Sequence, residues 1–275
     1  MAPNQAAGAG VEGPPRRHFH DEQAGLLRAQ GPLRFETSPQ LTALIRACYP
    51  APADTDAAAP SANPYALQPD TLKFLGALLD RLAPSEIVEF GSGESTRLLA
   101  RWASQHHARV LSVEHDRGWI GEIRARLTPP EQSAVNLVHA PLRPTLRGVR
   151  QFLTYRHLTA LAPAVQRAQL LLVDGPHVSG REPVLYLVLG HCRPGAVIVV
   201  DDYRNYGVRE ILLGVPAEVA ACFVAEPINE NSHGLCVLRC VRKSPAARVP
   251  SLSAAAILRS YWRCLRDFRD YGTGD

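Results

Sequence analysis

The stretch EIVEFGSGESTRLLA, residues 86–100, decides the fold of this chain. A short apolar run ends in an acid, a pair of glycines follows, and a helical pattern begins directly after the glycines. A glycine-containing turn between a strand and a helix lies at the edge of an open α/β sheet where ligands bind. The question is therefore whether the flanking sequence builds such a sheet, and which ligand the turn would suit.

The chain on both sides of this turn alternates between short apolar runs and helical patterns. We expect strands at 86–90, 109–114, 134–140, 169–174 and 196–202, and helices near 70–83, 95–105, 118–127, within 148–166, and at 182–192 and 208–214. Two last apolar runs, 218–228 and 233–243, are separated only by a short polar turn. This pattern predicts an α/β fold: a doubly wound, Rossmann-like, seven-stranded sheet, mostly parallel, with a C-terminal antiparallel hairpin.

The residues around the glycine pair discriminate between two cofactors. A nicotinamide dinucleotide site requires G-x-G-x-x-G, but Thr96 occupies the third glycine position after Gly91 and Gly93. Glu89 precedes the first glycine by two residues, where an acid suits an ammonium group and repels a pyrophosphate. The turn therefore favours S-adenosylmethionine, and a dehydrogenase or a tight turn without any ligand are the alternatives.

A second acid lies at the end of the next strand. Glu114 closes VLSVE about 20 residues after the glycine pair, where a carboxylate can accept hydrogen bonds from ribose hydroxyls. Both cofactor families use this arrangement. Glu114 therefore indicates a nucleoside without choosing between the two cofactors.

The combination of FGSGEST, VEHD, VDGPH and VVDDYR resembles a broad family of bacterial class I S-adenosylmethionine-dependent methyltransferases. Many of its members are predicted to modify small molecules or sugars. The resemblance covers about residues 65–243 and implies a transferase that binds S-adenosylmethionine through Glu89, Gly91, Gly93, Ser95 and Glu114. It also implies that Ala140 and Leu142 lie near the adenine.

Three acids follow the fourth and fifth expected strands. Asp174 ends one of them, and Asp201 and Asp202 end the next. Because neighbouring strands are about 4.8 Å apart, these carboxylates can converge at one edge of the sheet. They then need a shared proton, an arginine such as Arg204 or Arg209, or a divalent cation such as Mg²⁺. The metal hypothesis assigns Asp174, Asp201 and Asp202 as its ligands.

The sequence DGPH adds a candidate base. His177 stands three residues after Asp174, and the ordinary pKa of a histidine suits proton abstraction near neutrality. We expect Asp174 and His177 to be catalytic in the methylation of a hydroxyl oxygen of a small molecule or sugar. A metal-independent N-methyltransferase and a non-catalytic binding protein with the same fold are the alternatives.

The chain outside this domain has a different character. We expect a disordered tail at 1–35, a helix and linker at 36–64, and an amphipathic helical extension at 244–275 after the methyltransferase domain at 65–243. The formal net charge of +4 is small and does not predict nucleic-acid binding. No signal peptide or transmembrane segment is evident, and the scattered cysteines suit a reducing compartment, so the expected location is the cytoplasm.

Two further segments suggest a role. The long connection at 140–157 contains several arginines and Tyr155, which can shape an acceptor site or simply form a basic face. The C-terminal helix places its apolar residues on one stripe: Ile257, Leu258, Tyr261, Trp262, Leu265 and Phe268. We expect this stripe to pack on its own domain or to form a homodimer, and a membrane surface or another partner is the alternative.

Overall fold

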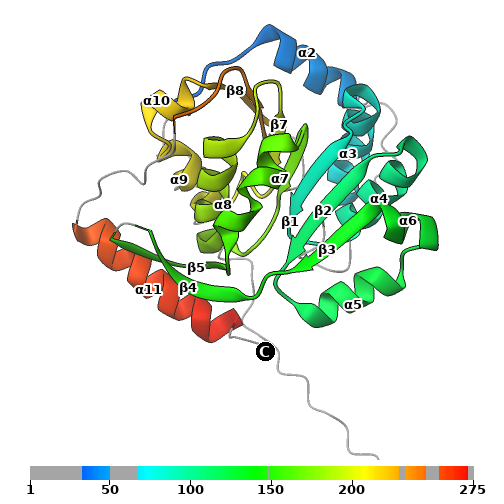
Figure 1. Cartoon of the computed structure of the whole chain (residues 1–275). Coiled ribbons are helices and arrows are strands. Elements are labelled where there is room, and N and C mark those ends of the chain that lie inside the picture. The colour runs from blue at the N-terminus through cyan, green and yellow to red at the C-terminus, as the bar shows by residue number, and fades with distance from the viewer. Residues whose placement is uncertain (1–32, 50–66, 148, 229–232, 246–253, 272–275) are drawn as a thin grey trace, which may run out of the picture. The chain divides into compact units, whose positions relative to one another are not determined.

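The computed structural model describes residues 33–49, 67–147, 149–228, 233–245 and 254–271 (Figure 1). The predicted tail at 1–35 lies outside these ranges except for its last three residues, and the linker at 51–64 lies outside them entirely. No helix in the described ranges is long and apolar enough to cross a bilayer.

The main sheet has seven strands in the order β3-β2-β1-β6-β7-β9-β8. The strands are β1 (Glu86–Phe90), β2 (Arg109–Glu114), β3 (Val135–His139), β6 (Leu170–Val173), β7 (Val197–Val200), β8 (Phe223–Ile228) and β9 (Leu235–Cys240). The first five of these are parallel, and β9 runs antiparallel to both β7 and β8. The predicted Rossmann-like sheet and its antiparallel C-terminal hairpin are confirmed.

Helices follow the strands as the alternation predicts. They are α2 (Pro39–Cys48), α3 (Pro69–Leu82), α4 (Glu94–His106), α5 (Arg117–Ala125), α6 (Pro129–Ala134), α7 (Ala162–Arg167), α8 (Val178–His191), α9 (Tyr206–Leu213), α10 (Ala217–Ala220) and α11 (Ala254–Tyr271). The side chains of each strand alternate between two apolar layers. Leu171 and Val173 join one layer with Phe90, whereas Leu170 and Leu172 join the layer formed with α2, α3 and α4.

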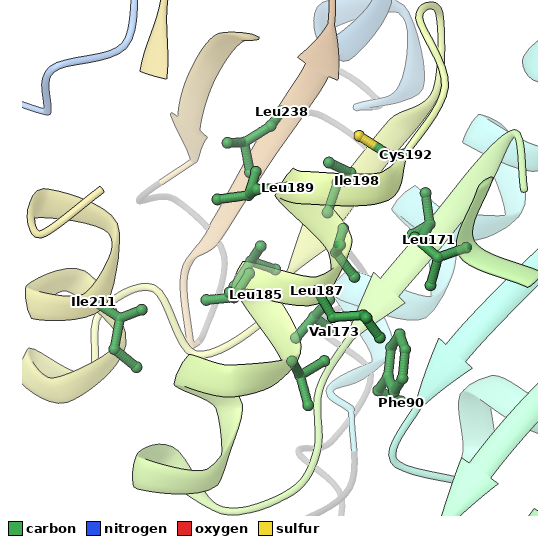
Figure 2. Packing of buried hydrophobic residues seen from close by; sticks show 14 of the residues in the cluster. Phe90, Leu171, Val173, Leu185, Leu187, Leu189, Cys192, Ile198, Ile211 and Leu238 are labelled. Atoms are coloured by element: carbon green, nitrogen blue, oxygen red, sulfur yellow. The ribbon is translucent and has the colours of Figure 1, made fainter. Parts of the chain in front are cut away.

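The middle of helix α8 is buried on every side. Val184, Leu185, Leu187 and Leu189 are all buried. Figure 2 shows Leu185, Leu187 and Leu189 between the sheet and neighbouring helices. A helix that is apolar all round belongs in the interior of a protein. Since α8 begins directly after VDGPH, this packing fixes the position of the loop that carries Asp174.

The connection at 140–157 contains a hairpin that the sequence did not predict. Residues Leu142–Arg147 and Arg150–Tyr155 form the antiparallel strands β4 and β5, which make a separate two-stranded sheet. The helix expected within 148–166 is reduced to a short 3₁₀ turn (Leu158–Leu161) and α7. Helices α8 and α11 pack against β5, so tertiary contacts override the helical pattern.

The N-terminal helix α2 forms where it was predicted. Ser38 caps it by accepting a hydrogen bond from the N–H of Leu41, and Pro39 occupies its first turn. Thr42 donates a hydrogen bond to Glu226 of β8 at 2.8 Å. Together with the buried Leu41, these contacts attach α2 to the sheet.

Candidate active site

The two glycines of the first loop have different reasons to be glycine. Gly91 adopts φ +95°, and a Cβ atom there would lie 2.6 Å from the backbone nitrogen of Gly175. The loops after β1 and β6 therefore pack against each other without room for a side chain. A Cβ atom at Gly93 would meet nothing within 4 Å, and its φ of −174° suits any residue. The fold requires Gly91, but Gly93 leaves open space over the loop.

Glu89 is fully buried behind this loop. Its carboxylate accepts hydrogen bonds from the hydroxyls of Ser95 (2.5 Å), Thr96 (2.6 Å) and Ser112 (2.5 Å). Burial raises the pKa of Glu89 to about 7, although the three hydrogen bonds act in the opposite direction. Thr96 also accepts a hydrogen bond from the N–H of Gly93 at 2.8 Å. Glu89 therefore holds the glycine loop and the start of α4 together, and its contact with a ligand stays a prediction.

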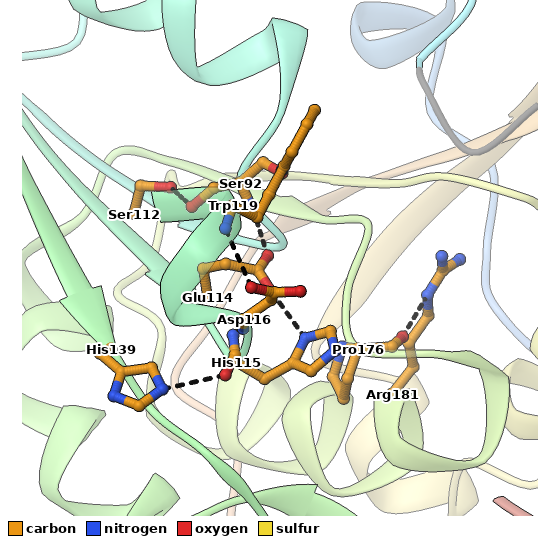
Figure 3. Close-up of polar contacts among 9 residues, drawn as sticks. All are labelled: Ser92, Ser112, Glu114, His115, Asp116, Trp119, His139, Pro176 and Arg181. Carbon is orange, nitrogen blue, oxygen red and sulfur yellow. Dashed lines mark hydrogen bonds and ion pairs between the residues drawn. The ribbon is translucent and has the colours of Figure 1, made fainter. Parts of the chain in front are cut away.

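Glu114 lies at the end of β2, beside the same loop (Figure 3). One carboxylate oxygen accepts from the N–H of Ser92 at 2.9 Å, and the other accepts from the N–H groups of His115 (2.7 Å) and Asp116 (2.9 Å). The His115 ring nitrogen Nδ1 is 2.6 Å from the latter oxygen. Burial acts to raise the pKa of Glu114, but the hydrogen bonds and the charge of His115 outweigh it, so the pKa is lowered. Glu114 is thus kept ionised.

The residues predicted beside the adenine lie next to Glu114. Ala140 and Leu142 are both buried, and the N–H of Ala140 donates to the backbone oxygen of Glu114 at 2.7 Å. Trp119 donates from its indole N–H to the backbone oxygen of Ser92 at 2.8 Å, so the loop is also fixed from this side (Figure 3).

The acids after β6 and β7 are brought together by one arginine. The buried Arg181, on the second turn of α8, places its guanidinium nitrogen NH2 3.1 Å from Asp174 and 2.9 Å from Asp202. It also donates to the backbone oxygens of Pro176 (3.0 Å) and Asp201 (3.2 Å). From the sequence, Arg204 and Arg209 were the candidates for neutralising these acids. In the structure, Arg181 is the arginine that contacts Asp174 and Asp202.

One guanidinium does not balance three carboxyl groups. Burial raises the pKa of Asp174 to about 6, with Arg181 acting against the shift and Asp202 adding to it. Burial and the charges of Asp174 and Asp202 raise the pKa of Asp201 well above its usual value. Oxygen Oδ1 of Asp201 is buried and has no hydrogen-bond partner. The group therefore holds more carboxyl groups than cations and a buried polar atom that a ligand can satisfy.

Arg181 competes with a cation for two of the three predicted metal ligands, so a metal bound by Asp174, Asp201 and Asp202 stays a prediction. A guanidinium already lies within 3.1 Å of both Asp174 and Asp202. A different set, Asp201, Asp202 and His233, brings three potential ligand atoms within 4.8 Å of one another. His233 Nδ1 is 3.5 Å from Asp202 in this set.

His177, the predicted base, faces the C-terminal helix. Its Nε2 atom lies 3.1 Å from a carboxylate oxygen of Asp267 on α11; Asp267 is buried and His177 is partly buried. The sequence did not connect these two residues, because 90 positions separate them in the chain. An acid paired with a histidine orients the imidazole ring, so α11 contributes to the position of His177.

Tyr155 is the last residue of β5 and lies beside the loop after β6. Its hydroxyl is fully buried and has no hydrogen-bond partner. Burial raises its pKa well above the usual value, and the charges of Glu114 and Asp174 add to the shift. A Cβ atom at Gly175 would lie 2.8 Å from this hydroxyl. Tyr155 is thus a second polar group available to a ligand.

Comparison with known proteins agrees with this geometry at the level of the domain. Residues 88–203, from β1 to just beyond β7, match the family model described as "Methyltransferase domain". This match supports a methyltransferase domain in this segment of the chain. No curated protein matches the chain in a sequence search.

Solved structures resemble the fold only distantly. A putative caffeoyl-CoA O-methyltransferase from Staphylococcus aureus matches with 12% identity over 62% of this chain and 82% of that chain, at a TM-score of 0.42. An RNA methyltransferase from Salinibacter ruber, in complex with S-adenosyl-L-homocysteine, matches with 13% identity over 63% and 93% of the two chains, at a TM-score of 0.38. These likenesses carry no argument about the acceptor.

Proposed function

We propose that this chain is an S-adenosylmethionine-dependent methyltransferase that methylates a hydroxyl oxygen of a small molecule or sugar. The observation that carries the proposal is the open space at Gly93 beside Glu114, inside the segment that matches a methyltransferase-domain model. A glycine that neither the backbone nor the packing requires is explained by a ligand that approaches the loop closely.

The first loop supplies the residues that would hold the cofactor. One carboxylate oxygen of Glu114 accepts a hydrogen bond from the N–H of Ser92 and has a further lone pair for a ribose hydroxyl. Gly91 and Ser95 form the loop, with Ser95 fixed by Glu89. Ala140 and Leu142 give a buried apolar surface beside Glu114, which suits an adenine ring.

The acids after β6 and β7 supply the proton chemistry. When bound, S-adenosylmethionine provides an electrophilic methyl group. Asp174, with a pKa of about 6, is mostly ionised near neutrality and is basic enough to take a proton from an acceptor hydroxyl. Arg181 holds this carboxylate in place at 3.1 Å. His177, oriented by Asp267, is the second candidate for the base.

A metal-assisted version of the reaction is a second candidate. It rests on the close approach of Asp201, Asp202 and His233 and on the unpartnered oxygen of Asp201. A divalent cation there would lower the pKa of an acceptor hydroxyl. Mg²⁺ or Mn²⁺ added to the enzyme, followed by a chelator, separates the two versions: turnover that is unchanged by both supports the version with Asp174 and Arg181 alone.

The acceptor class is tested by measuring S-adenosylhomocysteine released with a panel of phenols, sugars and amines. We expect release with hydroxyl acceptors, with kcat rising as pH increases through about 6, where Asp174 loses its proton. Asp174→Asn should lower kcat by roughly 10²–10⁴-fold. Exclusive methylation of amines would instead establish the N-methyltransferase alternative, and binding of the cofactor without turnover would favour a non-catalytic protein.

A further inference from the structure

The C-terminal helix α11 packs on the domain with its less apolar face. Ser260, Cys264 and Asp267 are buried, and the hydroxyl of Ser260 accepts a hydrogen bond from the N–H of Gln151 of β5 at 3.4 Å. Arg263 forms an ion pair with Glu210 of α9 at 3.1 Å. The apolar stripe therefore does not pack on its own domain, which was one of the two arrangements expected for an amphipathic helix, and the homodimer stays a prediction.

The apolar stripe of α11 is consequently exposed. Leu258, Trp262 and Leu265 are 62%, 72% and 60% exposed, and Tyr261 and Phe268 flank them. The adjoining β4–β5 hairpin exposes two more apolar side chains, Leu146 and Val149. Seven of the eight large hydrophobic residues that are exposed in the described ranges belong to these two elements, which lie side by side in Figure 1. An apolar patch concentrated in this way marks an interaction surface.

The charges around this patch are predominantly positive. Helix α11 itself contains four arginines against two aspartates, so it carries a formal charge of +2. Arg266 and Arg269 are exposed on α11, and Arg269 follows Leu265 by four positions and so lies on the apolar stripe itself. The surface therefore favours a partner that is both apolar and negatively charged.

We infer that the exposed face of α11 binds the surface of an anionic lipid bilayer. A single helix that combines Trp, Tyr, Phe and Leu on one stripe with arginines beside it has the composition of helices that lie in a membrane interface. Aromatic rings and arginine side chains both suit the boundary between head groups and acyl chains. A symmetric dimer through the same stripe would place equal sets of arginines against each other. The inference does not depend on the reaction proposed above.

Co-sedimentation of the full chain with vesicles tests this inference. We expect binding to phosphatidylcholine vesicles that contain about one third phosphatidylserine, and roughly tenfold weaker binding to pure phosphatidylcholine or at 0.5 M NaCl. Trp262→Ser combined with Leu265→Ser should weaken binding at least about tenfold. Arg269→Glu should weaken binding to the anionic vesicles by roughly tenfold or more.

A control variant and a folding check accompany the vesicle-binding measurements. Val241→Ser changes an exposed apolar residue outside the patch and should bind vesicles like the wild type. Far-ultraviolet circular dichroism must show that each variant is folded, and Leu258→Ser serves as the replacement if the double variant is not. Absence of vesicle binding by the folded wild type overturns the inference. A dimer in analytical ultracentrifugation that Trp262→Ser converts to a monomer also overturns it, since a second copy would then cover this face.

Discussion

Two groups of acids lie at the same edge of the sheet, and their surroundings differ. Glu89, in β1, and Glu114, at the end of β2, accept hydrogen bonds from hydroxyls and backbone N–H groups of nearby residues. Asp174, Asp201 and Asp202, after β6 and β7, share one guanidinium and leave a buried oxygen without a partner. The first group builds the loop. The second retains unsatisfied charge and polarity, which is typical of a reactive site.

The largest effect is expected from Arg181→Met, which removes the guanidinium from the second group. It leaves buried carboxyl groups without a counter-charge, so the free energy of unfolding should fall by about 3–5 kcal/mol. Urea unfolding at pH 8 measures the change.

Two comparison variants sharpen this result. Arg167→Met alters an exposed arginine and should change stability by no more than about 0.5 kcal/mol. Adding Asp202→Asn to Arg181→Met should restore part of the loss, because it removes one of the repelling charges. If Arg181→Met is no worse than Arg167→Met, the guanidinium does not hold the acids together.

A smaller effect should separate the two glycines of the first loop. Gly91→Ala strains a left-handed backbone and drives its Cβ atom into Gly175, so we expect a loss of about 3 kcal/mol. Gly93→Ala adds a methyl group to open space and should change stability by less than about 0.5 kcal/mol. Thermal unfolding of both variants measures the difference, and equal losses would contradict the distinct roles assigned to these glycines.

The smallest effects concern pH. The raised pKa of Glu89 means that its contribution to stability is complete below its ordinary pKa of 4.5 and is lost as pH rises through about 7. Glu114 has a lowered pKa, so its contribution is complete above the ordinary value and is lost as pH falls through the folded one. At pH 8, Glu89→Gln should therefore raise the free energy of unfolding, whereas the matched Glu114→Gln should lower it by about 1–3 kcal/mol.

Urea unfolding of both variants at pH 5 and pH 8 tests this contrast. The difference between Glu89→Gln and the wild type should shrink as pH falls, since Glu89 is then protonated in the wild type as well. If the stabilities of Glu89→Gln and Glu114→Gln respond to pH in the same way, the pKa values of Glu89 and Glu114 are not shifted in opposite directions.

The sequence was sufficient to locate the acids at this edge of the sheet, but not to identify the arginine that holds the second group together. Buried parallel strands are continuous apolar runs, so their ends, and with them Glu89, Glu114 and Asp174, can be read directly. Arg181 could not be assigned, because its role depends on how the α8 turn faces two strand ends. The β4–β5 hairpin was missed for a similar reason: its strands form against α8 and α11, which are distant in sequence.

The C-terminal helix shows the limit of periodicity. The pattern predicts an amphipathic helical extension at 244–275, and within it the structure has a helix at Ala254–Tyr271. It does not say which side contacts the domain, because that depends on specific partners. Asp267 binds His177 and Arg263 binds Glu210, and these contacts turn the polar side inward.

The central claim is that the open space at Gly93 admits S-adenosylmethionine. Calorimetric titration of the full chain with S-adenosylhomocysteine tests it most directly, with Gly93→Val as the variant that fills the space and Gly121→Val, another glycine without neighbours within 4 Å, as the control. We predict binding by the wild type and by Gly121→Val, and at least about tenfold weaker binding by a folded Gly93→Val. No heat with the wild type, or equal affinity in all three proteins, would contradict the claim.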